Sequence, residues 1–224
     1  EEIGWFLREA GFLHLKDWWP TDLMAELSSD MDDAVGDYMR GDGRSWWART
    51  DDGGDRCVRL QYFQACSVAA GQMLVDEHHL RIAALPGDGH ASGWEGTDGE
   101  NAIEALIKPL GVVEGISDLP WHKDCGQGGH SYFCNGLTAG ISVTGADQRS
   151  GALGVVPGSH RANVQTAGKD DSLDMAAIKL ETKTGDVTVH CSDTLHRAHR
   201  PTERPRKVVY TGFRLGVKPG DVLE

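Results

Sequence analysis

Four short β-rich runs in the second half of the chain constrain its fold more than any other feature. They cover residues 140–144, 151–156, 185–190 and 207–213, and clusters of Gly, Pro, Asp and Ser separate them. Short strands punctuated in this way are typical of an antiparallel sandwich or barrel. We therefore expect a mainly β fold with flanking helices, whose closed or double-sheet core has a mouth suited to a small-molecule site.

The first part of the chain carries helical patterns instead. Residues 2–10 suit a short amphipathic helix, and a second helix is expected to begin at Thr21. Residues 36–56 are rich in Gly and Asp and are expected to form a long loop. Helical character returns around residues 65–84.

The composition is that of one globular domain. With 224 residues, 39% of them hydrophobic and 25% charged, the chain can bury a core and does not resemble a disordered protein. We expect a single domain over 1–224, with a helical N-terminal part of about 1–110 and a β-core of about 111–218. No apolar run approaches the roughly 18 residues that cross a bilayer, so no membrane partner is expected. The net charge of −12 argues against binding of DNA or RNA.

The cysteine pattern points to a reducing compartment. Five cysteines are an odd number, and none of them forms a CxxC pair. A disulfide framework is therefore not expected, and a cytoplasmic location is. The sequence leaves the oligomeric state open.

An H-x-D pair, His122 and Asp124, offers two ligands for a metal ion. Residues i and i+2 of a strand project to the same face, so this imidazole and carboxylate can reach one point. H-x-D arises often by chance, and alone it favours a surface pair. A third ligand is available from His196, with His199 as its rival. Two histidines and one carboxylate leave three metal positions open, as in non-haem Fe(II) oxygenases.

Arg206 strengthens this interpretation. It follows His196 at a short interval and precedes an apolar strand. A fixed guanidinium can bind a carboxylate in bidentate fashion. A dicarboxylate cosubstrate that chelates the metal through its keto-acid end would present its other carboxylate there. His196 fits this spacing better than His199, and a zinc hydrolase with the same ligands would leave Arg206 unexplained.

Several stretches resemble the phytanoyl-CoA dioxygenase family, within the Fe(II)/2-oxoglutarate oxygenase superfamily. The run 151–161, GALGVVPGSHR, is similar to the family's G-x-L-x-V-x-P-G-S-H run and is the most specific of them. The others are WHKD at 121–124, the G-D … L-H approach at 185–196, RKVV at 206–209 and the opening at 6–20. The resemblance thus covers nearly the whole chain, in the right order.

The resemblance implies a double-stranded β-helix, a jelly-roll or cupin-like core. It implies that His122, Asp124 and His196 bind Fe(II), and that Arg206 binds the far carboxylate of 2-oxoglutarate. With O2 as the other cosubstrate, the implied enzyme is a dioxygenase that hydroxylates a small metabolite or acyl-type substrate and releases succinate and CO2. The carboxylate of Asp124 leaves no position for a halide ligand, which favours hydroxylation over halogenation.

The chain departs from the family pattern two positions after the last ligand. Family members often carry a small hydroxyl residue there that supports the cosubstrate, whereas this chain has Ala198. Thr138, Ser142 and Thr188 are the candidates for the same task.

Candidates for binding the substrate are Arg59, Gln61 and Trp47. Arg59 and Gln61 lie on an alternating run, for which a solvated strand face is the alternative. Trp47, with its neighbour Trp46, either covers a pocket or buries its ring in the core. No basic patch indicates a nucleotide such as coenzyme A. A catalytically inactive β-barrel binding protein that retains the oxygenase fold is the alternative function, and release of succinate would separate the two.

Overall fold

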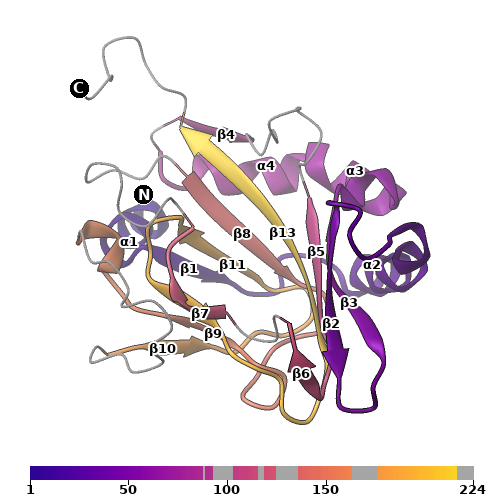
Figure 1. Ribbon diagram of the computed structural model, residues 1–224. Coiled ribbons are helices and arrows are strands. Elements are labelled where there is room, and N and C mark those ends of the chain that lie inside the picture. Colours follow the sequence, from indigo (N-terminus) through magenta and orange to yellow (C-terminus); the bar gives the residue numbers. More distant parts are fainter. Residues whose placement is uncertain (88, 93–102, 116–118, 125–135, 163–175, 216–224) are drawn as a thin grey trace, which may run out of the picture.

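Two antiparallel sheets form the body of the molecule in the computed structural model, which describes residues 1–87, 89–92, 103–115, 119–124, 136–162 and 176–215 (Figure 1). The main path of the major sheet runs in the order β1 (Phe12–Leu15), β11 (Val187–Cys191), β8 (Gly136–Ser142), β13 (Arg206–Leu215), β5 (Glu104–Lys108), β3 (Asp55–Gln61), β2 (Ser45–Thr50) and β6 (Val112–Glu114), and β4 (His90–Ser92) pairs with the end of β13. The minor sheet runs in the order β10 (Ile178–Leu180), β9 (Leu153–Val155), β12 (His196–Ala198) and β7 (Leu119–His122). The predicted double-sheet β core is confirmed.

Helices cover the outer face of the major sheet, where α2, α3 and α4 are seen beside and behind it in Figure 1. The α-helices are α1 (Glu2–Ala10), α2 (Thr21–Ala34), α3 (Val68–Val75) and α4 (Glu77–Ala84), with 3₁₀ turns at η1 (Val35–Asp37), η2 (Phe63–Ala65) and η4 (Ser159–Arg161). Met24, Leu27 and Met31 of α2 are fully buried, and they follow the spacing that puts apolar residues on one helix face. They share one hydrophobic core with Val209 and Phe213 of β13.

Local capping fixes where the shorter helices begin and end. The Ser67 hydroxyl accepts a hydrogen bond from the backbone N–H of Ala70 at the start of α3, and the Asp76 carboxylate accepts one from His78 at the start of α4. Gly11 ends α1 with a φ of 80°, in the left-handed region that favours glycine. None of the helices in the described part of the chain is both long and apolar enough to cross a membrane.

The central strands of the major sheet have two different faces. Leu137, Ala139 and Ile141 of β8 point into the helix-covered core. The alternate residues Thr138 and Gly140 line cavities between the two sheets. This period of two is the pattern that a strand imposes. It places polar side chains of β8, β11, β13, β5 and β3 in the space that the minor sheet closes.

One expectation about the N-terminal part is wrong. Residues 36–56 do not form a long loop, because residues 45–50 form β2 and pair with β3. Asp and Gly are concentrated in the turn at residues 51–54, next to β2. Because these residue types are typical of turns, the composition of the segment does not indicate a strand. The described residues among the first 110 contribute five strands, β1 to β5, so a boundary at about 110 separates helices from strands only in part.

Candidate active site

The side chains of His122, Asp124 and His196 meet at one point between the sheets. β7 and β12 are antiparallel neighbours, and His122 lies directly opposite His196 in their register. Oδ1 of Asp124 lies 3.6 Å from Nε2 of His122 and 3.4 Å from Nε2 of His196. Within the described residues, this is the group of His, Cys, Asp or Glu side chains whose ligand atoms, all within 4.8 Å of one another, could hold a metal ion.

Both imidazoles are oriented for metal binding by the protein backbone. Nδ1 of His122 donates to the carbonyl of Pro120, and Nδ1 of His196 donates to the carbonyl of Thr194, each at 2.8 Å. When Nδ1 carries the only proton of each ring, the lone pair of its Nε2 can point at a cation.

The second oxygen of Asp124 is held by two protein donors. The hydroxyl of Thr138 donates to Oδ2 at 2.9 Å, and Nε2 of His190 lies 3.2 Å from the same atom. The Asp124 side chain keeps 32% of its surface exposed to the cavity. Burial opposes its charge, but His196, His122 and His190 outweigh burial and hold the pKa of the carboxyl well below its usual range.

His190 is a neutral donor in this arrangement. Its side chain is 1% exposed, and burial lowers its pKa to about 4. A neutral imidazole that carries its proton on Nε2 donates to the Asp124 carboxylate without adding a positive charge beside the metal position.

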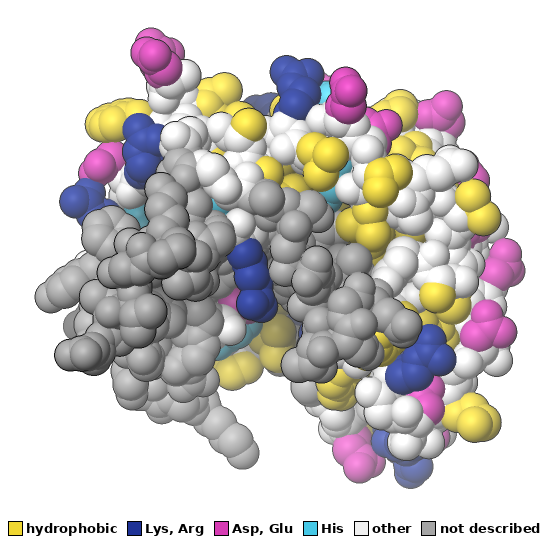
Figure 2. All heavy atoms as spheres, turned by 90° about the horizontal axis from the view of Figure 1, so that it is seen from above, with side chains coloured by type: hydrophobic (Ala, Val, Ile, Leu, Met, Phe, Trp, Pro, Cys, Tyr) yellow, Lys and Arg dark blue, Asp and Glu magenta, His cyan; other side chains and the backbone are white. Residues whose placement is uncertain are grey.

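A cavity of about 400 Å³ opens on this group. Its apolar wall includes Val58, Leu106, Ile107, Leu119 and Leu153. Its polar wall consists of Arg59, Glu104, Lys108, Thr138, His190, Tyr210 and Arg214, in addition to the three candidate ligands. The view from above shows histidine, acidic and basic side chains together in a hollow near the middle of that face (Figure 2). Pockets of this size, mostly apolar with a few converging polar groups, are typical of small-molecule sites.

Arg206 lies in a second, narrow space that adjoins this cavity. Leu153 and Tyr210 line both spaces. The Arg206 residue is 4% exposed, and its Nε and Nη2 atoms have no hydrogen-bond partner among the residues that the structure describes. Burial of the guanidinium lowers the pKa of Arg206. A buried cation without an acceptor is costly, so this position fits a ligand that brings a carboxylate.

The narrow space is lined by small and hydroxyl-bearing residues. Ser142 and Thr188 both lie in its wall, and the Ser142 hydroxyl is 2.8 Å from that of Thr182. Gly140 keeps the space open, because a Cβ there would lie 2.9 Å from both Thr188 Oγ1 and Tyr210 Cε1. The chemistry of these residues, a buried guanidinium beside hydroxyl groups, fits the carboxylate of a ligand such as 2-oxoglutarate.

The candidate substrate residues are placed unequally. Arg59 lines the main cavity, whereas Gln61 is not in its wall and donates to Glu104 at 3.4 Å. Trp47 packs against the hydrophobic core and donates through Nε1 to the Ser45 hydroxyl, while Trp46 lines the cavity. Trp46 lies opposite Arg59 of the cavity wall and Trp47 opposite Cys57 of the core, so strand alternation directs the two rings to opposite faces.

Other residues of the site carried weaker signals in the sequence. His190 shares a strand face with Thr188, and this pattern indicates a position near the pocket. The pattern does not reveal the contact of His190 with Asp124. Glu104 has no motif around it, and only the pairing of β5 with β3 and β13 reveals its position. His199, the rival ligand, lies edge-on to Trp121 and outside the metal-ligand group.

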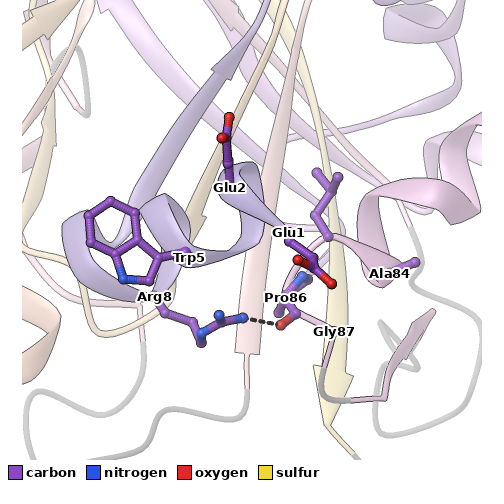
Figure 3. Close-up of a pocket in the computed structure, with 8 residues that line it drawn as sticks. Glu1, Glu2, Trp5, Arg8, Ala84, Pro86 and Gly87 are labelled. Atoms are coloured by element: carbon purple, nitrogen blue, oxygen red, sulfur yellow. Dashed lines mark hydrogen bonds between the residues drawn. The ribbon is translucent and has the colours of Figure 1, made fainter.

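A separate hollow of about 670 Å³ lies between α1 and the segment after α4. Figure 3 shows Arg8 reaching across it, where its Nη1 donates to the carbonyl of Pro86 at 2.5 Å. Its wall holds Glu1, Glu2 and Trp5 but no histidine or cysteine. We assign no chemistry to this hollow.

The sequence matches the model of the phytanoyl-CoA dioxygenase (PhyH) family over residues 7–208. No curated protein sequence matches the chain significantly.

Solved structures share the fold at low sequence identity. AviO1 from Streptomyces viridochromogenes Tue57 superposes with a TM-score of 0.74 at 18% identity, over 97% of this chain and 96% of that one. The non-haem alpha-ketoglutarate-dependent epimerase SnoN from nogalamycin biosynthesis gives 0.70 at 16%, over 95% and 82%. EctD from S. alaskensis, solved with 2-oxoglutarate and 5-hydroxyectoine, gives 0.70 at 16%, over 95% and 75%. The expected double-stranded β-helix fold is confirmed.

Proposed function

The chain belongs to the phytanoyl-CoA dioxygenase family, and from that premise we propose that it hydroxylates a small-molecule substrate at Fe(II) held by His122, Asp124 and His196. It is a non-haem iron, 2-oxoglutarate-dependent dioxygenase, and its cofactors are Fe(II), 2-oxoglutarate and O2. We propose the three iron ligands, the small-molecule class of the substrate and hydroxylation as the outcome.

The observation that carries the proposal is the pairing of a two-histidine, one-carboxylate group with a buried, unpartnered arginine. The ligand atoms of the first group lie within 4.8 Å of one another. Nε and Nη2 of Arg206 lack an acceptor in the adjoining space. The donor set suits ferrous iron, and the guanidinium suits the far carboxylate of 2-oxoglutarate.

The polar side chains around Asp124 and Arg206 each have a task in this scheme. Thr138 and His190 hold Asp124 so that Oδ1 faces the two imidazoles. Arg206 binds the distal carboxylate, and the hydroxyls of Ser142 and Thr188 lie in the wall around it. The apolar wall of the main cavity limits water at the reacting position. When bound, Fe(II), 2-oxoglutarate and O2 supply a two-electron oxidation of the substrate, with succinate and CO2 as coproducts.

Hydroxylation is the outcome that Asp124 favours. Its carboxylate occupies the ligand position that a halide would need, which disfavours halogenation. The solved neighbours include one described as an epimerase and one holding 5-hydroxyectoine, so this fold accommodates more than one outcome. An inactive binding protein is not favoured, because such a protein needs neither the metal ligands nor an unpaired buried arginine.

An anaerobic titration with Fe(II) and 2-oxoglutarate tests the proposal. We expect a visible metal-to-ligand charge-transfer band in the wild-type protein, and its loss in His122→Ala and Asp124→Ala. His160→Gln is the matched control, since His160 lies outside the cavity and bonds to the backbone of Arg8. A folded wild-type protein that forms no band, or an Asp124→Ala variant that hydroxylates at the wild-type rate, would overturn the assignment.

A further inference from the structure

Arg59 and Glu104 form an ion pair in the wall of the main cavity, where neither the metal ligands nor the Arg206 space uses it. Nη2 of Arg59 donates to Oε2 of Glu104 across the β3–β5 pair. The side chain of Glu104 is only 6% exposed, and that of Arg59 is 34% exposed. Nε2 of Gln61 approaches the other oxygen, Oε1, at 3.4 Å.

The guanidinium of Arg59 is held in place but not saturated. Its central carbon lies 4.4 Å from the centre of the Trp46 ring, so the indole supports one face of the group. Its Nε is buried and has no hydrogen-bond partner within the described residues. The Arg59 side chain lines the substrate cavity and 34% of its surface is exposed, so its outer N–H groups can donate to an acceptor there.

The carboxylate of Glu104 has acceptor positions available for further hydrogen bonds. An ionised carboxylate offers about four acceptor positions, and within the described residues the contacts with Arg59 and Gln61 use two of them. Among these residues, the cavity wall therefore presents donor groups of Arg59 and acceptor positions of Glu104 side by side. A buried ion pair gives little net stability, so stability alone does not account for this one.

We propose that the Arg59–Glu104 pair binds a hydroxyl group of an uncharged part of the substrate. A hydroxyl oxygen accepts from the guanidinium of Arg59, and the hydroxyl proton is donated to the Glu104 carboxylate, so one group contacts both side chains. The inference rests on the proposed function and specifies its substrate class: an alcohol or polyol whose carbon skeleton lies against Val58, Leu106 and Ile107.

The charge of the pair excludes an anionic group at this position. Glu104 already neutralises Arg59, so a substrate carboxylate would place a second anion against a buried first one. Lys108 and Arg214, the other Lys and Arg residues of the cavity wall, do not change the neutral charge of the Arg59–Glu104 pair. Nζ of Lys108 donates to the carbonyls of Ala198 and His199. Arg214 lies near the end of β13, whereas Arg59 is level with Val208 near its start.

Matched pairs of probe molecules test the proposal. The anaerobic protein loaded with Fe(II) and 2-oxoglutarate is titrated calorimetrically with cyclohexylmethanol and cyclohexanecarboxylate, and with 1-octanol and octanoate. Each pair shares one carbon skeleton. We expect at least one alcohol to bind at least tenfold more tightly than its carboxylate, which corresponds to about 1.4 kcal/mol.

Substitutions test whether the Arg59–Glu104 pair causes the preference for alcohols over carboxylates. Arg59→Met and Glu104→Gln should each weaken binding of the alcohol about tenfold, whereas Arg56→Met should leave it unchanged. Arg56 belongs to the same strand and also pairs with an acid, Asp52, but lies on the exposed surface. The double variant Arg59→Met/Glu104→Met buries no unpaired charge and keeps the test available if a single variant fails to fold.

The outcomes separate this inference from the proposed function. Tighter binding of the carboxylates, binding of the alcohols that is unchanged in the Arg59 variants, or no binding of any alcohol would overturn the hydroxyl assignment. The charge-transfer band in the same samples reports on the cosubstrate independently. Its absence, with the alcohol preference intact, would overturn the cosubstrate assignment and support the role of the pair.

Discussion

His190 and Asp124 are joined across the two sheets, with Nε2 of the imidazole 3.2 Å from Oδ2 of the carboxylate. His190 comes from β11 of the major sheet, whereas Asp124 follows β7 of the minor sheet. Since Thr138 also donates to Oδ2, only Oδ1 is left to face the ligand histidines. In the proposed iron site, the Asp124 carboxylate would thereby offer one oxygen, Oδ1, to the metal.

Replacing His190 should therefore weaken the binding of iron. We expect His190→Phe to raise the Kd for Fe(II) about 10- to 100-fold, the usual effect of removing a residue that orients a ligand. His190→Gln keeps an N–H donor and should recover most of the affinity. Anaerobic competition with a chromophoric chelator measures both. Equal affinities for wild type and the folded His190→Phe protein would contradict the positioning role.

The unpartnered guanidinium of Arg206 predicts a large effect on the cosubstrate. We expect Arg206→Met to raise the Kd for 2-oxoglutarate at least 100-fold, because two charge-assisted hydrogen bonds are lost in a buried site. Arg206→Lys keeps the positive charge but not the planar guanidinium, so its Kd for 2-oxoglutarate should lie between those of the wild type and Arg206→Met. Arg204→Met is the matched control, since Arg204 is exposed and pairs with Asp147. A Kd that is unchanged in Arg206→Met, measured anaerobically from the charge-transfer band, would argue against this site.

Gly140 should be needed for the same space. A methyl group at this position would lie 2.9 Å from the Thr188 hydroxyl and from the Tyr210 ring, so Gly140→Ala narrows the space beside Arg206. We expect about a tenfold or greater loss of 2-oxoglutarate affinity, with the Kd for Fe(II) unchanged because the ligand residues are untouched. Gly36→Ala is a suitable control, since a Cβ there meets no atom within 4 Å. Parallel losses of iron and cosubstrate affinity would indicate general disruption instead.

The parts of the fold that local patterns encode could be predicted. The runs at 185–190 and 207–213 coincide largely with β11 and β13, and the run at 140–144 overlaps the end of β8, because strand alternation and turn residues are recognised from neighbouring positions. The meeting of the H-x-D pair with His196 could be expected from two short motifs. What local patterns do not encode is which distant strands pair.

The Arg59–Glu104 pair and the His190–Asp124 contact depend on such pairing. Arg59 meets Glu104 only because β3 lies beside β5, and His190 meets Asp124 only because the two sheets close on each other. The position of Trp46, and not Trp47, in the cavity wall follows from the pairing of Trp46 with Arg59, which local sequence patterns do not reveal. The polar contacts that tune the site were therefore beyond the reach of the sequence, although the side chains that form its centre were not.

His79 predicts how the stability of the protein depends on pH. Its side chain is fully buried in α4, neither ring nitrogen has a hydrogen-bond partner within the described residues, and the ring centre lies 5.0 Å from that of Phe213. Burial lowers its pKa to about 4, whereas an unfolded histidine titrates near 6.5. Between these values the unfolded state binds more protons. The contribution of His79 is therefore fully present above about pH 6.5 and is lost as the pH falls toward 4.

Urea unfolding of the metal-free protein at pH 7.5 and pH 5 measures this loss. Over that interval one such histidine should cost about 2 kcal/mol of unfolding free energy. His190 titrates in the same direction, so His79→Leu is compared with wild type to isolate His79. We expect the variant to lose about 2 kcal/mol less than wild type between the two pH values, because leucine suits the apolar site and takes up no proton. Identical losses in both proteins would mean that His79 is accessible to protons in the folded state.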